Sequence, residues 1–359
     1  MRELLRETAD LAADFLETLP ERPVYPRVEV DELRARLGGP VPEGPTDPRE
    51  VVAELADVGS AGAVATAGGR YFGFVIGGAL PAALAADWLT SAWDQNAGLY
   101  VAGPAAAVAE EVAGAWLAEL LRLPREVSFA FVTGTQMAHA TALAVARNQV
   151  LAEIGWEVEH QGLVGAPPIR VLAGEKVHST LPRALRLIGL GTGAIVSVAA
   201  DDQGRMRADS LREALAGGDG PTIVCAQAGE VNTGSFDPFE EIADAAESAG
   251  AWLHVDGAFG LWAAASPRFA HLTAGAERAD SWATDGHKWL NVPYDCGIVL
   301  VRRPGDLRRS FTAAAGYLPP GAGFEAADGL RRGWRIAAER DILQRHPARA
   351  AHLPNSSNH

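Results

Sequence analysis

The polar side chains best suited to chemistry follow apolar runs that resemble β-strands. The segment SWATDGHKWL contains His287 and Lys288, and Lys288 is one of very few lysines because the 31 basic residues are nearly all arginine. In AWLHVDGAFG the apolar run ends at Asp256, where a buried carboxylate requires a cationic partner. His178, in GEKVHSTL, follows another such run. We therefore expect an amine, a carboxylate and two imidazoles to converge.

A further segment, FAFVTGTQMAHATAL, passes from a strand into a helix through Thr133, Gly134 and Thr135. The first N–H groups of a helix lack partners within the helix and carry partial positive charge, so this turn predicts an anion site. Attraction to a helix terminus contributes only about 0.3 to 2 kcal/mol. The two threonine hydroxyls and the ring of His287 are therefore expected to add to it. Thr233, in AGEVNTGSF, follows a further strand.

One ligand uses all of these groups. Pyridoxal phosphate requires an anion site for its phosphate, a lysine for the Schiff base, and a carboxylate that keeps its pyridine nitrogen protonated so that the ring accepts electrons. The sequence therefore predicts a pyridoxal phosphate site that contains Lys288, Asp256 and the turn at Thr135.

The segments EKVHST, HVDGAFG and TDGHKWLNVPYDCG, in this order, resemble the group II pyridoxal-phosphate-dependent decarboxylases, relatives of the aromatic amino acid and glutamate decarboxylases. The resemblance extends from residue 1 to about residue 320 and includes DLAADFLETLPERPV and RYFGFVIGGALPAALAADWL. It implies fold type I, the α/β architecture of aspartate aminotransferase, in a homodimer with active sites at the subunit interface. It also implies decarboxylation of an amino acid to its amine.

The resemblance further implies a role for single residues. Lys288 matches the Schiff-base lysine, and Asp256 matches the carboxylate that faces the pyridine nitrogen. Ala258 matches the small residue beneath the ring, and His178 matches the histidine that stacks on the other face. Thr233 matches a hydroxyl residue near the cofactor.

Two further matches concern the phosphate and the reaction. His287, Gly134 and Thr135 fall in the phosphate-binding elements of the family. Tyr317, in FTAAAGYLPPGAG, matches the tyrosine of a mobile catalytic loop that protonates the carbanion left by carbon dioxide. This match favours decarboxylation, and an aminotransferase or another fold type I lyase is the alternative.

Strand-like runs alternate with helical patterns from residue 66 to about residue 320. Such alternation predicts an α/β domain around a largely parallel sheet, with ligands at the carboxyl ends of the strands. Residues 1–65 are expected to form a helical arm for dimerisation, 66–320 the cofactor-binding domain and 321–359 an atypical tail. The expected strands are 129–132, 169–173, 195–198, 222–227, 252–256, 280–283 and 297–301.

Composition narrows the classes of partner. The formal net charge of −14 repels nucleic acid and anionic membrane surfaces, so a small amino acid substrate is the expected partner. The longest uncharged apolar stretch, 71–86, is too short and too interrupted to span a bilayer, and the N-terminus lacks the apolar core of a signal peptide. Two cysteines, Cys225 and Cys296, cannot build a disulfide framework, which favours a reducing cytoplasm.

Three other interpretations compete. The resemblance fades after about residue 320, where relatives continue into a small C-terminal domain, so a truncated, non-catalytic remnant is one alternative. His254 and Asp256, with Asp285 and His287, could ligate the metal of a hydrolase, although we predict no metal. The dinucleotide-like GLGTGA at 189–194 follows a helix and precedes a strand, which is the reverse of the required order.

Overall fold

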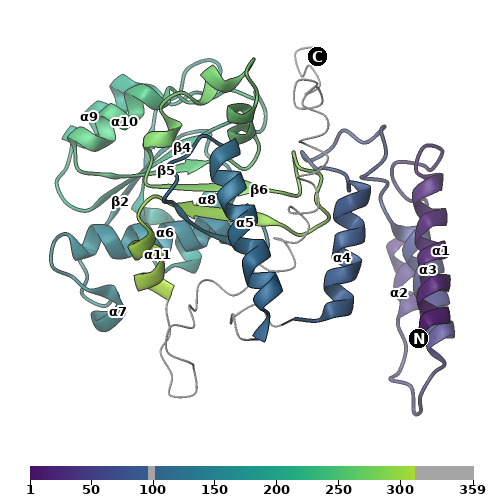
Figure 1. Ribbon diagram of the computed structural model, residues 1–359. Coiled ribbons are helices and arrows are strands. Elements are labelled where there is room, and N and C mark those ends of the chain that lie inside the picture. Colours follow the sequence, from purple (N-terminus) through teal and green to yellow (C-terminus); the bar gives the residue numbers. More distant parts are fainter. Residues whose placement is uncertain (96–101, 312–359) are drawn as a thin grey trace. The chain divides into compact units, whose positions relative to one another are not determined.

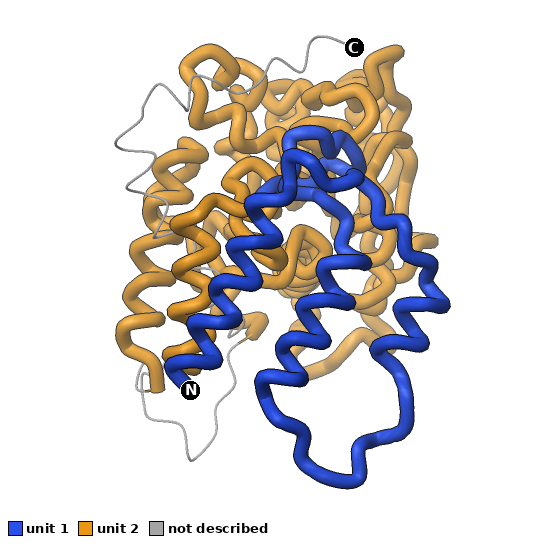
Figure 2. The backbone as a smooth tube through the Cα atoms, turned by 90° about the vertical axis from the view of Figure 1, so that its right-hand side faces the viewer, with its two compact units in different colours: residues 1–78 blue, residues 79–359 orange. Residues whose placement is uncertain are grey.

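The structure is a computed structural model that describes residues 1–95 and 102–311. The chain divides into two compact units, residues 1–78 and a larger unit that begins at Ala79 (Figure 2). Every candidate site residue within the described part of the chain belongs to the larger unit.

The first unit consists of three helices with little core. The side chain of Asp47 accepts a hydrogen bond from the N–H of Arg49, which caps the third helix. Arg49 also forms ion pairs with Glu3 at 2.6 Å and Glu7 at 3.1 Å on the first helix. The first and second helices bury no side chain. The helices are α1 (Arg2–Thr18), α2 (Val30–Leu37) and α3 (Pro48–Gly62).

The second unit contains a seven-stranded sheet with the order β1-β7-β6-β5-β4-β2-β3. Strands β3, β2, β4, β5 and β6 pair in parallel, and β7 is antiparallel to both of its neighbours, β6 and β1. The strands are β1 (Ser128–Val132), β2 (Arg170–Gly174), β3 (Ile195–Val198), β4 (Thr222–Gln227), β5 (Trp252–Asp256), β6 (Ser281–Asp285) and β7 (Gly297–Val301).

Helices cover both faces of this sheet (Figure 1). Side chains alternate along each strand. In β7, for example, Ile298 and Leu300 pack in a cluster with α5, α9 and α10, whereas Val299 and Val301 pack in a cluster with α6, α8 and α11. The α-helices are α4 (Pro81–Trp93), α5 (Pro104–Leu120), α6 (Thr135–Ala152), α7 (Val158–Gln161), α8 (Thr180–Leu187), α9 (Ala208–Ala216), α10 (Phe239–Ser248) and α11 (Pro304–Phe311).

The predicted α/β fold of type I is confirmed, with a mostly parallel sheet of seven strands between helices. Four of the predicted strands, 195–198, 222–227, 252–256 and 297–301, have the observed bounds. The largest difference is in β6, which continues to Asp285 rather than ending at residue 283. The extension carries β6 up to the segment that contains Lys288.

Short 3-10 helices complete the described unit: η2 (Thr192–Ala194), η3 (Gly260–Ala265), η4 (Ala270–Thr273) and η5 (Ala276–Arg278). Among the helices of residues 1–95 and 102–311, none combines the length and the apolar composition needed to cross a membrane.

Candidate functional site

The central lysine and carboxylate lie at the carboxyl ends of neighbouring strands. Asp256 is the last residue of β5, and it lies opposite Ala283 of the parallel strand β6. Strand β6 ends at Asp285, and Lys288 follows in the next turn. The Nζ atom of Lys288, whose side chain is mostly buried, lies 3.3 Å from Oδ2 of Asp285. The fold therefore brings Asp256 and Lys288 to one edge of the sheet.

Asp256 is held as a carboxylate in a nearly buried position. Burial alone would raise its pKa, but the facing His139 and the N–H of Ala258 outweigh burial and keep the pKa of Asp256 below its usual range. Nε2 of His139 lies 3.3 Å from Oδ2 of Asp256, and the N–H of Ala258 donates to Oδ1 at 3.1 Å. Asp256 can therefore supply a fixed negative charge at this edge.

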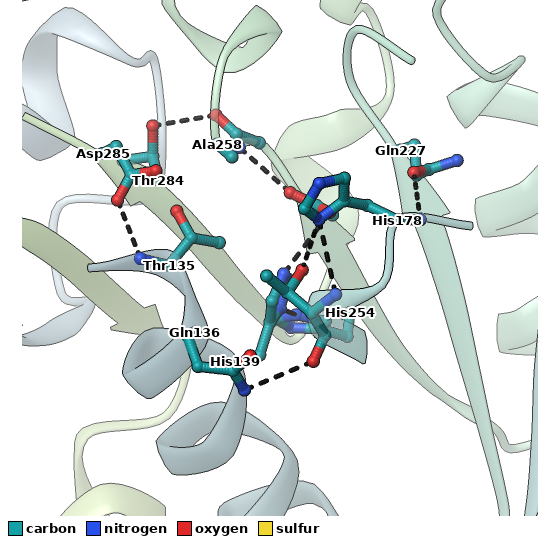
Figure 3. Close-up of polar contacts among 12 residues, drawn as sticks. Thr135, Gln136, His139, His178, Gln227, His254, Ala258, Thr284 and Asp285 are labelled. Carbon is teal, nitrogen blue, oxygen red and sulfur yellow. Dashed lines mark hydrogen bonds and ion pairs between the residues drawn. The ribbon is translucent and has the colours of Figure 1, made fainter. Parts of the chain in front are cut away.

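His178 lies beside the same edge, in the segment between β2 and α8. Its backbone N–H donates to Oε1 of Gln227 at 3.2 Å, and its ring Nδ1 contacts the hydroxyl of Thr180 at 2.9 Å (Figure 3). Burial lowers the pKa of His178, the charge of Asp256 opposes this shift and the charge of Lys288 adds to it. Since the backbone N–H of Thr180 also donates to Nδ1, the ring proton belongs on Nε2.

In the turn before α6, where the sequence predicts an anion site, one of the expected donors is occupied. The N–H of Thr135, the first residue of α6, donates to Oδ1 of Asp285 at 2.7 Å (Figure 3). This N–H is thus not free for an anion, in contrast to the expectation from the helix terminus. The hydroxyl Oγ1 of Thr135 is buried and has no hydrogen-bond partner among the described residues. Gly134 adopts a φ of +151°, a conformation that favours glycine.

His287 adjoins this turn. Its Cε1 atom would lie 3.3 Å from a Cβ atom added to Gly134, and its Nε2 lies 3.6 Å from Oδ1 of Asp285. Burial lowers the pKa of His287, and the charge of Asp285 opposes the shift. The N–H of Cys296 donates to Nδ1 at 3.0 Å, so Nε2 carries the proton of the neutral ring. His287 therefore carries a hydrogen-bond donor near Asp285, the carboxylate that accepts from the N–H of Thr135.

The other predicted residues lie at different distances from this centre. Ala258 follows directly after β5 and contacts Asp256 through its backbone. Thr233 lies in the exposed loop after β4, where its N–H donates to Glu230 at 2.8 Å and its hydroxyl contacts Ser235 at 2.9 Å. The structure does not record a contact from Thr233 to the other site residues. Tyr317 lies outside the described residues.

Sequence reasoning missed two residues of the site, His139 and Asp285. His139 was passed over because it lies in an alanine-rich helical pattern. A signal was present, since His139 follows Thr135 by four residues and such pairs share one face of a helix. Asp285 was considered only as a metal ligand, although it is the carboxylate that joins the α6 terminus to Lys288.

The structure also bears on the metal interpretation. His254 and Asp256 face the same side of β5, since both contact His139, as alternation in a strand predicts. Within residues 1–95 and 102–311, no three histidine, cysteine or acidic side chains are grouped so that they could hold a metal ion. Each nitrogen of His254 instead contacts a side chain, His139 or Ser281.

The described residues fit pyridoxal phosphate. The unpartnered hydroxyl of Thr135 and the Nε2–H of His287 are donors that suit a phosphate. Asp256 provides an ionised carboxylate, and Lys288 an amine at the same edge of the sheet. Lys288, Asp256, Thr135 and His287 are the residues that would hold this cofactor.

Comparisons with known proteins agree with this fit. The aromatic-L-amino-acid decarboxylase of Bacillus atrophaeus is 30% identical over 322 residues, which cover 89% of this chain and 65% of that protein. Tryptophan decarboxylase 1 of Oryza sativa subsp. japonica is 32% identical over 341 residues, which cover 89% of this chain and 64% of that protein. The chain thus spans just under two thirds of the length of these relatives.

Solved structures show the same fold. A structure of Oryza sativa TDC with PLP and tryptamine matches with a TM-score of 0.86 and 28% identity, covering 96% of this chain and 76% of that one. Mouse CSAD in its apo form matches with a TM-score of 0.87 and 23% identity, covering 97% and 75%. The family model described as the pyridoxal-dependent decarboxylase conserved domain matches residues 42–336. The chain therefore belongs to the pyridoxal-dependent decarboxylase family.

Proposed function

We propose that the protein is a pyridoxal-phosphate-dependent decarboxylase that converts an L-amino acid into its amine and carbon dioxide. The observation that carries this proposal is the position of Lys288 and Asp256 at the carboxyl ends of adjacent strands, with His178 within electrostatic reach of both. Membership of the family supports it. The chain covers 65% and 64% of the two curated relatives named above, so their activity is proposed for this chain and not transferred to it.

Each side chain at the strand ends has a task in this reaction. Bound pyridoxal phosphate supplies an electron sink for the electron pair that remains when the bond between Cα and the carboxylate breaks. Lys288 holds the cofactor covalently, and the ionised Asp256 keeps the ring nitrogen protonated. Ala258 leaves room beneath the ring. His178, neutral because burial lowers its pKa, offers its Nε2–H to the substrate.

The remaining residues bind the phosphate and return a proton. The hydroxyl of Thr135 and the ring of His287, beside Gly134, bind the phosphate, and Thr233 supplies a hydroxyl near the cofactor if its match to the family holds. Tyr317 delivers the proton to Cα after carbon dioxide leaves, which separates decarboxylation from transamination.

Aromatic amino acids are the substrates that we propose first. The two curated relatives named above are an aromatic-L-amino-acid decarboxylase and a tryptophan decarboxylase. The transfer of an aromatic side chain from water into an apolar pocket lowers the free energy, so an aromatic substrate requires an apolar pocket and no charged partner. An acidic substrate would require a cation in the pocket instead.

We also propose that the protein is a homodimer. Helix α1 buries no side chain, and its apolar residues Leu5, Leu11 and Leu16 are exposed. On α4, Trp88 and Leu89 are 43% and 51% exposed. Exposed apolar side chains on each of these helices favour an interface.

The decisive experiment uses the small number of lysines. The chain has two, Lys176 and Lys288. Purified protein is incubated with pyridoxal phosphate, reduced with borohydride and digested, and the modified peptide is identified by mass spectrometry. We expect the label on Lys288, its loss in Lys288→Ala, and its retention in the control variant Lys176→Ala. Sedimentation of the same preparation reports whether the protein is a dimer.

Product analysis completes the test. Unreduced wild type, saturated with pyridoxal phosphate, is incubated with L-tryptophan, L-tyrosine, L-DOPA and L-glutamate, and amine, carbon dioxide and 2-oxo acid are measured. Amine and carbon dioxide in equal amounts support a decarboxylase. A 2-oxo acid without carbon dioxide would identify an aminotransferase. A protein that takes up no cofactor would contradict the proposed function altogether.

A further inference from the structure

A chain of buried polar side chains extends from Asp256 into the core. His139 Nε2 lies 3.3 Å from Oδ2 of Asp256, and His139 Nδ1 lies 2.8 Å from Nε2 of His254 (Figure 3). His254 Nδ1 lies 2.9 Å from Oγ of Ser281, and Nε1 of Trp252 donates to the same Oγ at 2.9 Å. Four side chains thus connect the carboxylate to the interior.

Packing alone does not account for this arrangement. His139 lies on α6, His254 on β5 and Ser281 on β6, and each of the three residues is 0% exposed. Most of the buried side chains of α6 around His139 are alanine, leucine and valine residues of one apolar cluster, although Thr135 and Thr141 are also buried. A buried polar group costs free energy unless it is hydrogen-bonded, and an apolar side chain would carry no such cost.

The donor in each hydrogen bond of this chain can be assigned by counting the protons that its side chains carry. Trp252 can only donate to Ser281, so the hydroxyl of Ser281 is free to donate to Nδ1 of His254. A neutral His254 then carries its proton on Nε2 and donates to Nδ1 of His139. A neutral His139 in turn carries its proton on Nε2, which faces Asp256. Every contact then has one donor and one acceptor.

The reverse direction is unfavourable. If His254 donated through Nδ1 to Ser281, its Nε2 would accept from Nδ1 of His139. A neutral His139 would then present a lone pair to the Asp256 carboxylate, unless it took up a second proton. In both satisfactory arrangements Nε2 of His139 bears a proton toward Asp256. Nε2 of His139 makes no aligned hydrogen bond in the structure, and its 3.3 Å distance to Oδ2 of Asp256 makes an ion pair only when His139 is protonated.

We propose that His139 and His254 are positioning residues that keep the Asp256 carboxylate ionised and fixed against the ring nitrogen of bound pyridoxal phosphate. The inference rests on the proposed function, since it assumes the cofactor site. His139 acts through Asp256 and does not touch the cofactor in this role. His254 fixes the tautomer of His139, and Ser281 fixes that of His254.

The test uses two substitutions that separate the nitrogens of His139. In His139→Gln the amide occupies the place of Nε2 and still donates toward Asp256. In His139→Asn the amide occupies the place of Nδ1, so the contact with His254 remains and the donor toward Asp256 is lost. The two substituted side chains are matched in polarity and cannot titrate, and each retains only one of the two contacts. A loss of function in His139→Asn that is absent in His139→Gln therefore reports the Asp256 contact, and the opposite pattern reports the contact with His254.

The readout is binding rather than turnover. Dissociation constants are measured for pyridoxal phosphate and for 1-deazapyridoxal phosphate, which lacks the ring nitrogen. The ratio of the two constants reports the contact between Asp256 and this nitrogen. We expect the wild type and His139→Gln to prefer pyridoxal phosphate, and the preference to fall about tenfold in His139→Asn, the effect of one hydrogen bond to a charged group.

The outcomes are distinguishable. A wild type that discriminates, with Gln and Asn variants that match it, overturns this inference and leaves the proposed function standing. A wild type that binds neither compound overturns the proposed function and this inference with it. If both variants fail to fold, ¹⁵N NMR of the wild type without cofactor decides. Protons on Nε2 of both His139 and His254 support the inference, and an unprotonated Nε2 on His139 overturns it.

Discussion

The turn before α6 holds a buried hydroxyl that has no partner. Thr135 Oγ1 is surrounded by protein, and the N–H of the same residue is bound to Asp285. A hydroxyl in this state raises the free energy of the folded protein, because it has lost its hydrogen bonds to water. A bound phosphate would restore a partner. Binding of a phosphate would therefore recover the stability that the unpaired hydroxyl of Thr135 costs.

Replacement of Thr135 by valine tests this relation, because the two side chains have the same shape. We expect Thr135→Val to unfold with a free energy equal to that of the wild type or up to about 1 to 2 kcal/mol higher, since an unsatisfied polar group is removed. Pyridoxal phosphate should bind about tenfold more weakly, since one hydrogen bond to a charged group is lost. Urea unfolding without cofactor and cofactor titration measure the two effects separately.

Thr135→Ser is the control for this substitution, because it retains the hydroxyl. It should bind pyridoxal phosphate like the wild type. If valine lowered both stability and affinity, the hydroxyl would have a protein partner, and its assignment to the phosphate would lose its support.

At the scale of elements, the strands were predictable because each is a short apolar run bounded by turn residues or by charge. Residues 222–227 and 252–256 have the predicted bounds. Both are interior strands of a parallel sheet, where apolar side chains are needed on both faces. The end of β6 was misplaced because Thr284 and Asp285 are polar, yet both are buried. Their partners, Gly257 and Thr135, come from other parts of the chain.

The contacts within the site were less predictable than the elements. The order of residues indicated that Asp256, His178 and Lys288 follow strands, and carboxyl ends of parallel strands meet at one edge. The sequence gives no such rule for a helix that crosses the sheet. The contact between His139 and His254 depends on how α6 lies against β5, and only the assembled structure defines it.

The approach of β7 to the turn before α6 sets the position of the anion site. A Cβ atom added to Gly297 would lie 2.4 Å from backbone atoms of Gly134, which cannot move aside like a flexible side chain. We expect Gly297→Ala to lower the free energy of unfolding by about 1 to 3 kcal/mol or more, the usual range for overpacking. It should also weaken cofactor binding, because the turn would move away from His287.

Gly305→Ala is the matched control, since a Cβ atom added to Gly305 on α11 meets nothing within 4 Å. This variant should unfold at the same urea concentration as the wild type or at a slightly higher one, because alanine stabilises a helix more than glycine does. Equal stability of the two alanine variants would show that β7 does not hold the turn by backbone contact. Urea unfolding provides the comparison.

At the scale of the whole molecule, the free energy of unfolding depends on buried histidines that remain neutral. The pKa of His254 is lowered to about 3, mainly by burial. The charge of His139 contributes to this lowering and the charge of Asp256 opposes it. Burial also lowers the pKa of His178 and of His287. Burial acts in the opposite direction on Asp237, whose pKa it raises to about 6. The pH dependence of stability is therefore a sum of opposing contributions.

The contribution of His254 can be isolated by comparison with His254→Gln. Because the folded pKa lies below the unfolded value of about 6.5, the unfolded chain binds a proton that the folded chain excludes. Its contribution is present above pH 6.5 and is lost as the pH falls toward 3. Between pH 6.5 and 4.5 the stability advantage of the wild type should therefore decrease, by about 1.4 kcal/mol per pH unit once the unfolded residue is protonated.

Urea unfolding of both proteins at half-unit steps of pH measures this difference. Buried groups that do not interact with His254, such as Asp237, cancel because they are common to both. His160→Gln, at an exposed position on α7, controls for the loss of a histidine and should give a curve parallel to that of the wild type. Curves for wild type and His254→Gln that stay parallel down to pH 4.5 would mean that the folded protein accepts a proton on His254. The hydrogen bond between Ser281 and His254 would then run in the other direction, since a protonated His254 donates through both nitrogens.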